Sequence, residues 1–280
     1  MQDNLLILSA NMNHQPSALI SMLETTDAHI LLIQEPSWGR LVPKKSNVDP
    51  DGVEVKGTCS HPRWRTILPT VSSTDLIPHV AIFVRSNFTD TTTYSILPTM
   101  NSYSCLGIRL DTDTPIFIIN YYHHVVDKQP NLHHLFSLTI PDRPLLLCSD
   151  FNTHSPQWSP PDLPTLPWAP SLERWLDDHE LMSLVLEGTI TWRSTTGRDS
   201  LLNHIFVNMA FLSNPVFPAS CSISFKRTIS SDHAALFVDL PLYTPPPDPT
   251  PQTGWVIEDQ MEQEWKAAFA VTSLENTRRL

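Results

Sequence analysis

The sequence predicts an α/β fold in which two β-sheets pack face to face and helices lie outside them. Apolar runs of strand length alternate with polar, proline-rich segments along most of the 280 residues, a pattern typical of strands joined by irregular loops. Helical patterns lie between two groups of strands and do not follow every strand, which fits two packed sheets with helices outside. The 26 prolines and only 7 glycines also argue against a helical bundle.

The predicted elements follow the apolar runs in order. A strand at 5–10, a helix that begins near Pro16 and a strand at 29–34 open the chain, and a long loop then reaches about Pro62. The helix near 132–138 is short, and the helix at 171–181 is amphipathic with Ser171 as its cap. The remaining strands are expected at 65–68, 79–85, 92–97, 104–110, 115–122, 144–150, 201–207, 215–225 and 234–240.

The composition predicts one folded domain at residues 1–242, followed by two short segments. Hydrophobic residues make up 41% of the chain, which is enough for a sizeable core. Residues 243–257 contain the run TPPPDPTPQ, which predicts a stiff proline-rich linker. Residues 258–280 begin with an amphipathic pattern and are expected to form a C-terminal helix or tail.

The charge balance restricts how the chain can bind partners. Eighteen basic and 29 acidic side chains give a formal net charge of −11, which disfavours binding to nucleic acid through a basic face alone. A metal site, in contrast, needs carboxylates and supplies its own positive field. No apolar run approaches the ~18 residues that span a bilayer, and the first residues lack the basic segment of a signal peptide. We therefore expect no membrane partner and an intracellular location, nuclear or cytoplasmic.

Polar side chains with catalytic chemistry stand at the ends of several predicted strands. Strand ends present side chains to a shared crevice, and polar groups are costly to bury alone, so we expect these groups to satisfy one another or a metal ion. A glutamate is a hard oxygen donor suited to Mg²⁺, and a histidine titrates near neutrality. The set predicts metal-assisted phosphodiester hydrolysis; its members are Asn11, Glu35, Asp150, Asn152, Asp232 and His233.

Each of these motifs taken alone also has a purely structural interpretation. Glu35 stands before a proline and is compatible with a turn or a strand edge, and Asn152 is compatible with an Asx-turn. Asp232 is compatible with a plain turn residue that leaves His233 in solvent. The ordered set, and not any single motif, indicates a site.

The ordered set resembles the endonuclease/exonuclease/phosphatase superfamily and, within it, the endonuclease domain of non-LTR (LINE-type) retrotransposons. The likeness spans about residues 4–242 and implies a four-layer α/β sandwich of two packed, mostly antiparallel sheets flanked by helices. Residues 153–158 (THSPQW) are similar to the N-x-H-x-P-x-W stretch of those endonucleases. Thr191 and Trp192, followed by RDSLLNHIFVN, resemble their G-x-T-W … S-x-L-D-H-x-F-V-N segment.

The resemblance implies a role for each motif. By this likeness a glutamate binds Mg²⁺ (or Mn²⁺), a histidine and an aspartate activate water and handle the leaving oxygen, and amides and a tyrosine contact the phosphate. DNA is the implied partner, a reverse transcriptase domain enters only by analogy with the family, and we expect a monomer. The assignments are Glu35 for the metal; His233 and Asp150 for proton transfer; Asn11, Asn152 and Tyr122 for the phosphate; and Asp232 for assisting His233 or a second metal.

Two positions depart from the family pattern. Asn203 stands where the family has the aspartate that orients the catalytic histidine, here His233. An amide can hold the imidazole ring but cannot stabilise an imidazolium by charge, and the analogous change in a serine hydrolase costs about 10⁴ in turnover. Ser149 also replaces a family glycine and is expected to crowd the backbone near the site.

We therefore expect a Mg²⁺-dependent DNA endonuclease of retrotransposon descent whose activity is weakened by Asn203. Two alternatives stay open: a catalytically decayed relic that acts as a binding module, and a small-molecule phosphoesterase such as an inositol phosphatase. Against the second, the sequence has no loop rich in lysine and arginine to hold several phosphates.

The other histidines give weaker signals. A second metal site at the doublets His123–His124 and His133–His134 is disfavoured, because neighbouring residues of a strand point to opposite faces. His204 is expected to face outward from its strand. His154 and Trp158 are compatible either with loop packing or with substrate positioning.

Overall fold

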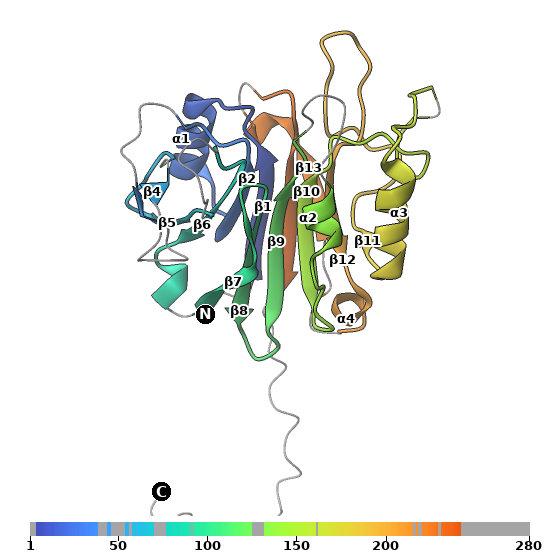
Figure 1. The fold of residues 1–280 in the computed structure, drawn as a ribbon. Coiled ribbons are helices and arrows are strands. Elements are labelled where there is room, and N and C mark those ends of the chain that lie inside the picture. Colours follow the sequence, from blue (N-terminus) through green and yellow to red (C-terminus); the bar gives the residue numbers. More distant parts are fainter. Residues whose placement is uncertain are drawn as a thin grey trace, which may run out of the picture. The chain divides into compact units, whose positions relative to one another are not determined.

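The computed structural model of the chain (Figure 1) describes residues 4–38, 44–45, 54–55, 58–69, 77–90, 92–124, 132–160, 162–214, 217, 220–228 and 231–241. The chain divides into two units, Met1–Tyr243 and Thr244–Leu280, and every described residue belongs to the first. Two predicted segments lie outside the described residues: the linker at 243–257 and the C-terminal helix or tail at 258–280. Apart from Tyr243, both belong to the second unit. Within the described part of the chain, no helix has the length and apolar character needed to cross a membrane.

The first large sheet has six strands in the order β13-β14-β1-β2-β6-β5. Only β1 and β2 run parallel to each other, and every other neighbouring pair is antiparallel. The parallel pair therefore ends at one edge of the sheet, where the residues after β1 and β2 lie side by side. The strands are β1 (Asn4–Asn11), β2 (Ile30–Gln34), β5 (Trp64–Ile67), β6 (Val80–Arg85), β13 (Ser220–Ser224) and β14 (Ala235–Pro241).

The second large sheet repeats this plan with the order β11-β12-β10-β9-β8-β7. Here β9 and β10 form the parallel pair, and the remaining pairs are antiparallel. The strands are β7 (Thr93–Ser102), β8 (Cys105–Asp111), β9 (Ile116–Tyr122), β10 (Leu145–Asp150), β11 (Met182–Ser183) and β12 (Asn203–Val207), and a separate two-stranded sheet joins β3 (Lys44–Lys45) to β4 (Glu54–Val55).

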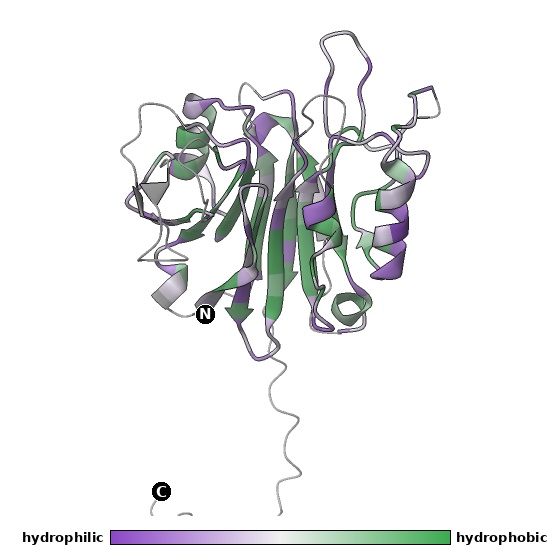
Figure 2. Ribbon diagram, viewed as in Figure 1, coloured by the Kyte–Doolittle hydropathy of each residue, from purple (hydrophilic) through white to green (hydrophobic). Residues whose placement is uncertain are grey.

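The alternation of side chains along β1 explains how the layers stack. Leu5 and Ile7 point to the core between the two sheets, where they belong to one cluster with Ile118 and Leu146 of the second sheet. The intervening side chains point the other way, because successive residues of a strand face opposite sides. Leu8 accordingly packs in a second cluster, which contains the apolar residues of the helix on the outer face. Figure 2 shows the apolar strands in the middle of the structure.

Helices cover the outer faces of the sheets, as the sequence predicts. Helix α1 (Pro16–Thr25) begins at a proline and buries Leu19 and Leu23 against the first sheet. Helices α2 (His133–Phe136) and α3 (Ala169–Asp178) lie beside the second sheet (Figure 1). The remaining helical segments are α4 (Met209–Leu212) and the 3-10 turns at Phe88–Asp90 and Phe225–Arg227. The predicted four-layer arrangement of two mostly antiparallel sheets with helices outside is confirmed.

Helix α3 begins two residues earlier than predicted. The sequence predicts Ser171 as its cap, but the helix starts at Ala169, and Trp168 occupies the capping position without a capping hydrogen bond from its side chain. Pro170 fits the first turn of a helix, where its missing N–H is not needed. Pro170, directly before Ser171, is thus the residue that indicates the earlier start of the helix.

A buried polar network joins the two sheets directly beneath the strand ends. The Gln34 side chain at the end of β2 is fully buried, and its Nε2 donates to Asn120 Oδ1 of β9 (2.6 Å) and to Ser9 Oγ of β1 (3.1 Å). Asn120 Nδ2 in turn donates to the backbone oxygens of Ile33 and Ala81, both at 3.0 Å. Because these buried groups pair with one another, the network fixes the relative position of β2 and β9.

Candidate active site

Asp150 connects the two sheets at the edge where the parallel strands end. It is the last residue of β10, and its side chain is fully buried. Asp150 Oδ2 accepts a hydrogen bond from Asn11 Nδ2 of β1 (2.9 Å) and lies 3.5 Å from His233 Nδ1. Its other oxygen, Oδ1, accepts from the backbone N–H of Asn152 (3.0 Å). Four of the predicted site residues thus meet at one carboxylate.

The electrostatic environment of Asp150 combines burial with several compensating groups. Burial raises the pKa of the Asp150 carboxyl above its ordinary value, and His233 and the hydrogen bonds from Asn11 and Asn152 partly offset this effect. The nearby carboxylate of Glu35 also raises the Asp150 pKa. A buried carboxyl with a perturbed pKa and specific partners is typical of functional sites.

His233 is held by the amide that replaces the expected aspartate. His233 is 6% exposed, and its Nδ1 lies 2.7 Å from Asn203 Oδ1. An amide oxygen only accepts hydrogen bonds, so Nδ1 carries a proton in the neutral ring and Nε2 is left as the basic nitrogen. Asn203 begins β12 directly opposite Asp150 in the sheet. The amide therefore orients the ring but supplies no charge.

Thr191 fixes the backbone around this pair. Its hydroxyl oxygen accepts hydrogen bonds from the backbone N–H groups of Leu202 (2.9 Å) and Asn203 (3.0 Å), and its carbonyl oxygen accepts from Ala234 N (2.8 Å). Ala234 directly follows His233. Thr191 thus bridges the two segments that carry Asn203 and His233, which explains structurally why the Thr191–Trp192 motif accompanies the site.

Asp232 lies at the outer side of His233. Its side chain is 37% exposed, and its Oδ1 is 3.8 Å from His233 Nε2. Trp192 Nε1 donates to Asp232 Oδ2 (2.8 Å), and Asn13 Nδ2 donates to Oδ1 (3.2 Å). Both carboxylate oxygens therefore have protein partners, and the aspartate lies on the same side of the imidazole as the free Nε2.

Glu35 projects from a tight turn directly after β2. Its φ of +44° lies in the left-handed region, which a residue with a side chain rarely adopts and which often marks functional sites. The Glu35 side chain is 15% exposed, and Oε1 lies 3.3 Å from Nε2 of the exposed His14. Its carboxylate also acts electrostatically on the Tyr122 hydroxyl and raises the pKa of that group.

Tyr122 and Asn152 link the Glu35 region to Asp150. Burial raises the pKa of the Tyr122 hydroxyl above its usual range, and the carboxylates of Glu35 and Asp150 raise it further. Tyr122 consequently stays protonated, although the Asn152 side chain acts on its pKa in the opposite direction. Asn152 has a φ of +45°, and its Nδ2 donates to the backbone oxygen of His123 (3.0 Å). The electrostatic interactions of Tyr122 with Glu35 and Asp150 and the contact of Asp150 with His233 therefore connect Glu35 to His233.

The donor set fits a divalent ion that keeps most of its own water. Within the described residues, no three His, Cys, Asp or Glu side chains converge so as to hold a metal ion by themselves. Mg²⁺ commonly takes only one or two protein carboxylates and completes its shell with water and substrate phosphate. The partly exposed oxygen atoms of Glu35 suit this kind of binding, whereas the site does not offer the closed protein cage typical of structural zinc.

His204 and Trp158, two residues near the site, are both buried. The expectation that His204 faces outward is wrong: its ring is fully buried between Trp158 and Phe206, at centroid distances of 5.0 and 5.2 Å. The side chain of Asn203, the preceding residue of β12, points to the site. Because successive side chains of a strand face opposite sides, the His204 side chain points into the core. Trp158 is 5% exposed and donates from Nε1 to Thr153 O (2.9 Å), so it packs within its loop.

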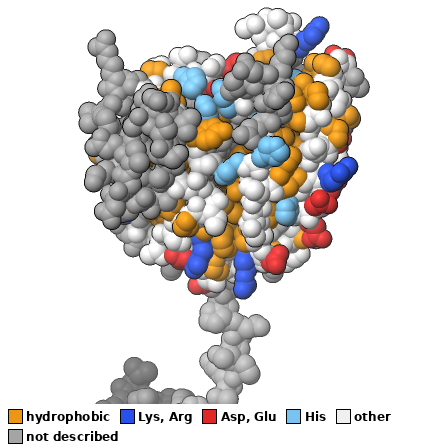
Figure 3. Space-filling model, in the orientation of Figure 1, with side chains coloured by type: hydrophobic (Ala, Val, Ile, Leu, Met, Phe, Trp, Pro, Cys, Tyr) orange, Lys and Arg blue, Asp and Glu red, His pale blue; other side chains and the backbone are white. Residues whose placement is uncertain are grey.

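Basic side chains do not gather into a patch on the face shown in Figure 3. Histidine side chains are spread across the middle of this face, and lysine and arginine side chains lie towards its margins. This distribution agrees with the net charge of −11. An anionic substrate would depend on locally supplied positive charge, such as a metal ion, more than on a broad basic surface at this face.

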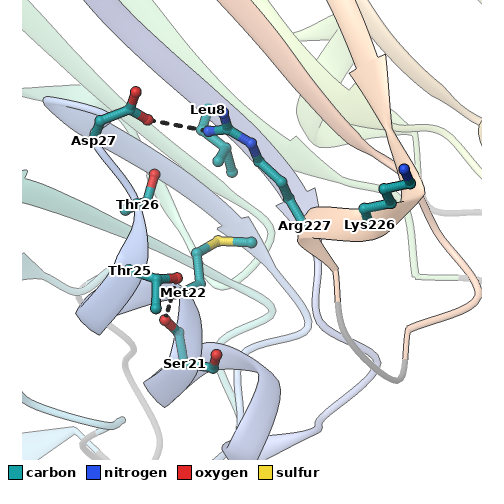
Figure 4. Close-up of a pocket in the computed structure, with 8 residues that line it drawn as sticks. All are labelled: Leu8, Ser21, Met22, Thr25, Thr26, Asp27, Lys226 and Arg227. Carbon is teal, nitrogen blue, oxygen red and sulfur yellow. Dashed lines mark hydrogen bonds and ion pairs between the residues drawn. The ribbon is translucent and has the colours of Figure 1, made fainter.

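The pocket drawn in Figure 4 lies away from these residues. It has a volume of about 380 Å³ and lies beside the C-terminal end of α1, where Arg227 reaches across to Asp27 (3.0 Å). None of the predicted site residues lines it. The candidate site is therefore an arrangement of side chains at the strand ends and does not coincide with this pocket.

Comparison with known proteins places this geometry in a structural class. A family model described as endonuclease-reverse transcriptase matches residues 116–237. The endonuclease domain of TRAS1, a telomere-specific non-LTR retrotransposon, superposes with a TM-score of 0.62 at 18% identity, over 84% of this chain and 98% of that domain. The chain has the endonuclease/exonuclease/phosphatase fold. The resemblance inferred from the ordered motifs is confirmed.

Two further solved structures share the endonuclease/exonuclease/phosphatase fold. The APE2 catalytic domain of Xenopus laevis matches with a TM-score of 0.55 at 15% identity, over 86% of this chain and 94% of that domain. An endonuclease/exonuclease/phosphatase protein from Beutenbergia cavernae matches with a TM-score of 0.53 at 12% identity, over 86% and 72% of the two chains. Comparison with curated proteins gave no significant match.

Proposed function

We propose that this chain is a Mg²⁺-dependent (or Mn²⁺-dependent) DNA endonuclease domain of retrotransposon descent. The observation that carries the proposal is that Asn152 and His233 converge on the buried Asp150, with the Glu35 carboxylate near enough to raise the pKa of both Asp150 and Tyr122. These residues come from both sheets and span the chain from β2 to the segment before β14. A metal-binding carboxylate, a base and phosphate-contacting donors in one connected arrangement suit phosphodiester hydrolysis.

In this proposal His233 and Asp150 handle protons. His233 Nδ1 donates its proton in a hydrogen bond to Asn203 Oδ1. The other ring nitrogen, Nε2, can therefore take a proton from the water that attacks the phosphate. Asp150 Oδ2 lies 3.5 Å from His233 Nδ1 and is the nearest buried charge to an imidazolium. It therefore supplies part of the charge stabilisation that an aspartate at position 203 would provide.

Asn11, Asn152 and Tyr122 would hold the scissile phosphate. Each amide NH₂ group carries two donors; Asn11 uses one on Asp150 and Asn152 uses one on His123 O, which leaves a second donor on each. Tyr122 stays protonated and contributes its hydroxyl. Donors that are fixed before the substrate binds stabilise the negative charge that develops on the phosphate oxygens.

Glu35 would hold the metal ion, and Asp232 would assist His233 or a second ion. When bound, the ion supplies Lewis-acid stabilisation of negative charge on the phosphate. The turn after β2 presents the Glu35 carboxylate near the Tyr122 hydroxyl. Asp232 Oδ1 lies 3.8 Å from His233 Nε2, where it is placed to assist that residue.

DNA is proposed as the substrate from the superfamily fold and the motif likeness to retrotransposon endonucleases. The TRAS1 domain with the matching fold is described as the endonuclease of a telomere-specific retrotransposon. The retroelement origin also makes a reverse transcriptase domain a proposed partner, and we propose that this domain acts as a monomer in a nuclear or cytoplasmic compartment. No contact described above favours a small-molecule phosphoesterase over a nuclease.

A plasmid-nicking assay tests the proposal. With Mg²⁺, the purified chain is expected to convert supercoiled plasmid to the open circular form, and Glu35→Gln and His233→Ala are expected to remove this activity. Glu24→Gln and His133→Ala, at exposed positions on α1 and α2, are the matched controls and should nick like the parent chain. Equal nicking by all four variants would contradict the assignment, as would hydrolysis of inositol phosphates with no cleavage of DNA.

A further inference from the structure

We infer that His123 is a positioning residue that fixes the Asp150–Asn152 segment in its active conformation. This inference rests on the proposed function, because it concerns the segment that carries two of its residues. His123 directly follows β9 and is 2% exposed. The residue touches neither substrate nor metal in the proposed mechanism, so it would act through the residues that do.

His123 forms hydrogen bonds with three consecutive residues of this segment. Its backbone N–H donates to Asp150 O (2.9 Å), its ring Nδ1 lies 2.7 Å from Phe151 O, and its backbone oxygen accepts from Asn152 Nδ2 (3.0 Å). Any residue could supply the two backbone contacts. The bond from the ring to Phe151 O depends on the histidine side chain itself.

The segment benefits from such external support because its backbone has an uncommon conformation. Asn152 has a φ of +45°, in the left-handed region, which asparagine adopts more readily than most residues with a side chain but still uncommonly. Conformations of this kind persist only where the surroundings hold them in place. The turn carries the Asn152 N–H to Asp150 Oδ1 (3.0 Å), so a loss of the turn would also move the carboxylate that touches Asn11 and His233.

The protonation state of the ring suits this task. Burial lowers the pKa of His123, so the ring is neutral near pH 7 and a carbonyl oxygen at Nδ1 selects the tautomer with a proton on Nδ1. The opposite nitrogen, Nε2, is buried without a hydrogen-bond partner among the described residues. Because an unpaired buried nitrogen costs free energy, packing alone does not explain a histidine here, whereas the bond from Nδ1 does.

The neighbouring aromatic residue limits how the ring can move. The His123 ring packs edge-on against Trp168, with centroids 5.9 Å apart and planes at 85°. Trp168 Nε1 donates to Thr153 Oγ1 (2.9 Å), and the Thr153 hydroxyl donates to Phe151 O (2.6 Å). The carbonyl oxygen of Phe151 is thus held from both sides, by His123 and by Thr153.

The second histidine of the doublet has a different environment. His124 stacks on His79, with ring centroids 4.3 Å apart. Adjacent side chains of an extended segment point in opposite directions, so only His123 faces the Asp150–Asn152 segment. The sequence doublet therefore contains two residues with separate surroundings and not a paired site.

Substitutions that keep or remove the Nδ1 donor test the inference. The amide nitrogen of asparagine can occupy the place of Nδ1, whereas that of glutamine corresponds to Nε2. His123→Asn should keep kcat for plasmid nicking within about threefold of the parent. His123→Gln and His123→Leu should lower kcat by about 10- to 100-fold, the usual cost of losing a supporting hydrogen bond to a ligand or catalytic group, with KM within about threefold.

A buried histidine elsewhere provides the control for general destabilisation. His29 directly precedes β2 and therefore lies at the end of this strand opposite to Glu35. It is 6% exposed, and its Nδ1 accepts a hydrogen bond from Leu6 N (2.9 Å). His29→Leu should lower the melting temperature but leave kcat unchanged at temperatures where the protein is folded. An unchanged kcat in His123→Leu, or equal losses in His123→Asn and His123→Gln, would overturn the inference.

A measurement without catalysis separates failure of this inference from failure of the proposed function. Hydrogen exchange of the Asn152 backbone amide in the full chain reports the turn directly. His123→Leu should accelerate this exchange at least tenfold and His123→Asn should not, even if the parent chain cleaves no DNA. Unchanged exchange in His123→Leu would overturn the positioning role.

Discussion

The inner and outer halves of the candidate site differ in their access to water. The residues of the inner half are at most 6% exposed in each case, and each has a hydrogen bond to another member of that half. The side chains of the outer half are 15% to 51% exposed. The inner half is Asn11, Asp150, Asn203 and His233, and the outer half is Glu35, His14 and Asp232.

This difference indicates a division of tasks. The inner half is arranged by the protein alone, and burial makes its electrostatic interactions strong, at the cost of a raised pKa for Asp150. The outer half leaves carboxylate oxygens near solvent, where an ion with its water and a phosphate can approach. Changes in the outer half should therefore affect ligand binding first, and changes in the inner half should affect proton transfer and stability.

The largest expected effect is a loss of kcat, which should be accompanied by a loss of metal binding at Glu35 but not at His233. Glu35→Gln should lower kcat by about 10³-fold, because a bound metal ion contributes several kcal/mol to the transition state, and should abolish Mg²⁺ binding by calorimetry. His233→Ala should lower kcat by about 10²- to 10⁴-fold but retain Mg²⁺ affinity within about threefold.

Glu24→Gln serves as the control for the first variant, since it makes the same chemical change at an exposed position on α1. Loss of Mg²⁺ binding in His233→Ala, or normal binding in Glu35→Gln, would show that the two halves do not divide the work in this way. Thermal unfolding of each variant excludes loss of the folded state as the cause.

The next effect concerns stability and its dependence on pH. His204 lies on β12 beside Asn203 and is fully buried, and burial lowers its pKa to about 3. The unfolded chain binds a proton at this histidine below about pH 6.5 and the folded protein does not, so its contribution to stability is full above pH 6.5 and is lost as the pH falls towards 3. The loss should reach roughly 3 kcal/mol at pH 4.

Replacing His204 with phenylalanine isolates this contribution. Trp158, Phe151 and Phe206 surround the ring, so His204→Phe keeps an aromatic ring in the site but removes the titration. Urea unfolding at pH 7 and pH 4 should show a smaller loss of stability in this variant than in the parent, and the exposed substitution His133→Phe should leave the loss unchanged. Parallel losses in parent and His204→Phe would refute the prediction.

Much of the fold and the identity of the candidate residues could be predicted from local sequence. Strand periodicity located β1, β2, β9, β10, β12 and β14 to within a few residues, because buried strands read as apolar runs with polar ends. The structure brings the predicted Asn11, Asp150 and His233 into contact. Their catalytic roles stay predictions.

Contacts between distant segments could not be predicted in the same way. Gln34 and Asn120 join the two sheets, yet each is one polar residue beside an apolar run, with nothing local to specify its partner. The prediction that His204 faces outward is wrong because aromatic side chains cover the face of β12 opposite to Asn203. The strand β11 and the helix α4 are too short to show a hydrophobic periodicity. Packing determines these features, and it depends on neighbours far away in sequence.

A smaller change is expected when charge is restored beside His233. Asn203→Asp should raise kcat by about 10- to 10²-fold, less than the ~10⁴ that the analogous aspartate is worth in a serine hydrolase. The gain is reduced because the buried carboxylate of Asp150 already lies 3.5 Å from His233 Nδ1, and two neighbouring carboxylates disfavour each other's ionisation.

The charge change itself needs a control at a distant position. Asn4→Asp lies at the exposed start of β1 and should leave kcat unchanged. An unaltered kcat in Asn203→Asp would mean that Asp150 already provides all the charge that His233 requires, and a loss of activity would mean that repulsion between the two carboxylates dominates.

The smallest effect is expected at the most exposed member of the outer half. His14 Nε2 lies 3.3 Å from Glu35 Oε1, but the His14 side chain is 51% exposed, and exposed ion pairs are worth only ~0.2–1 kcal/mol. His14→Ala should therefore change Mg²⁺ affinity by no more than about fivefold, and added salt should reduce that difference further. Calorimetry at two salt concentrations measures both. A loss as large as that of Glu35→Gln would make His14 part of the metal site, and the outer half would then be organised by the protein as tightly as the inner half.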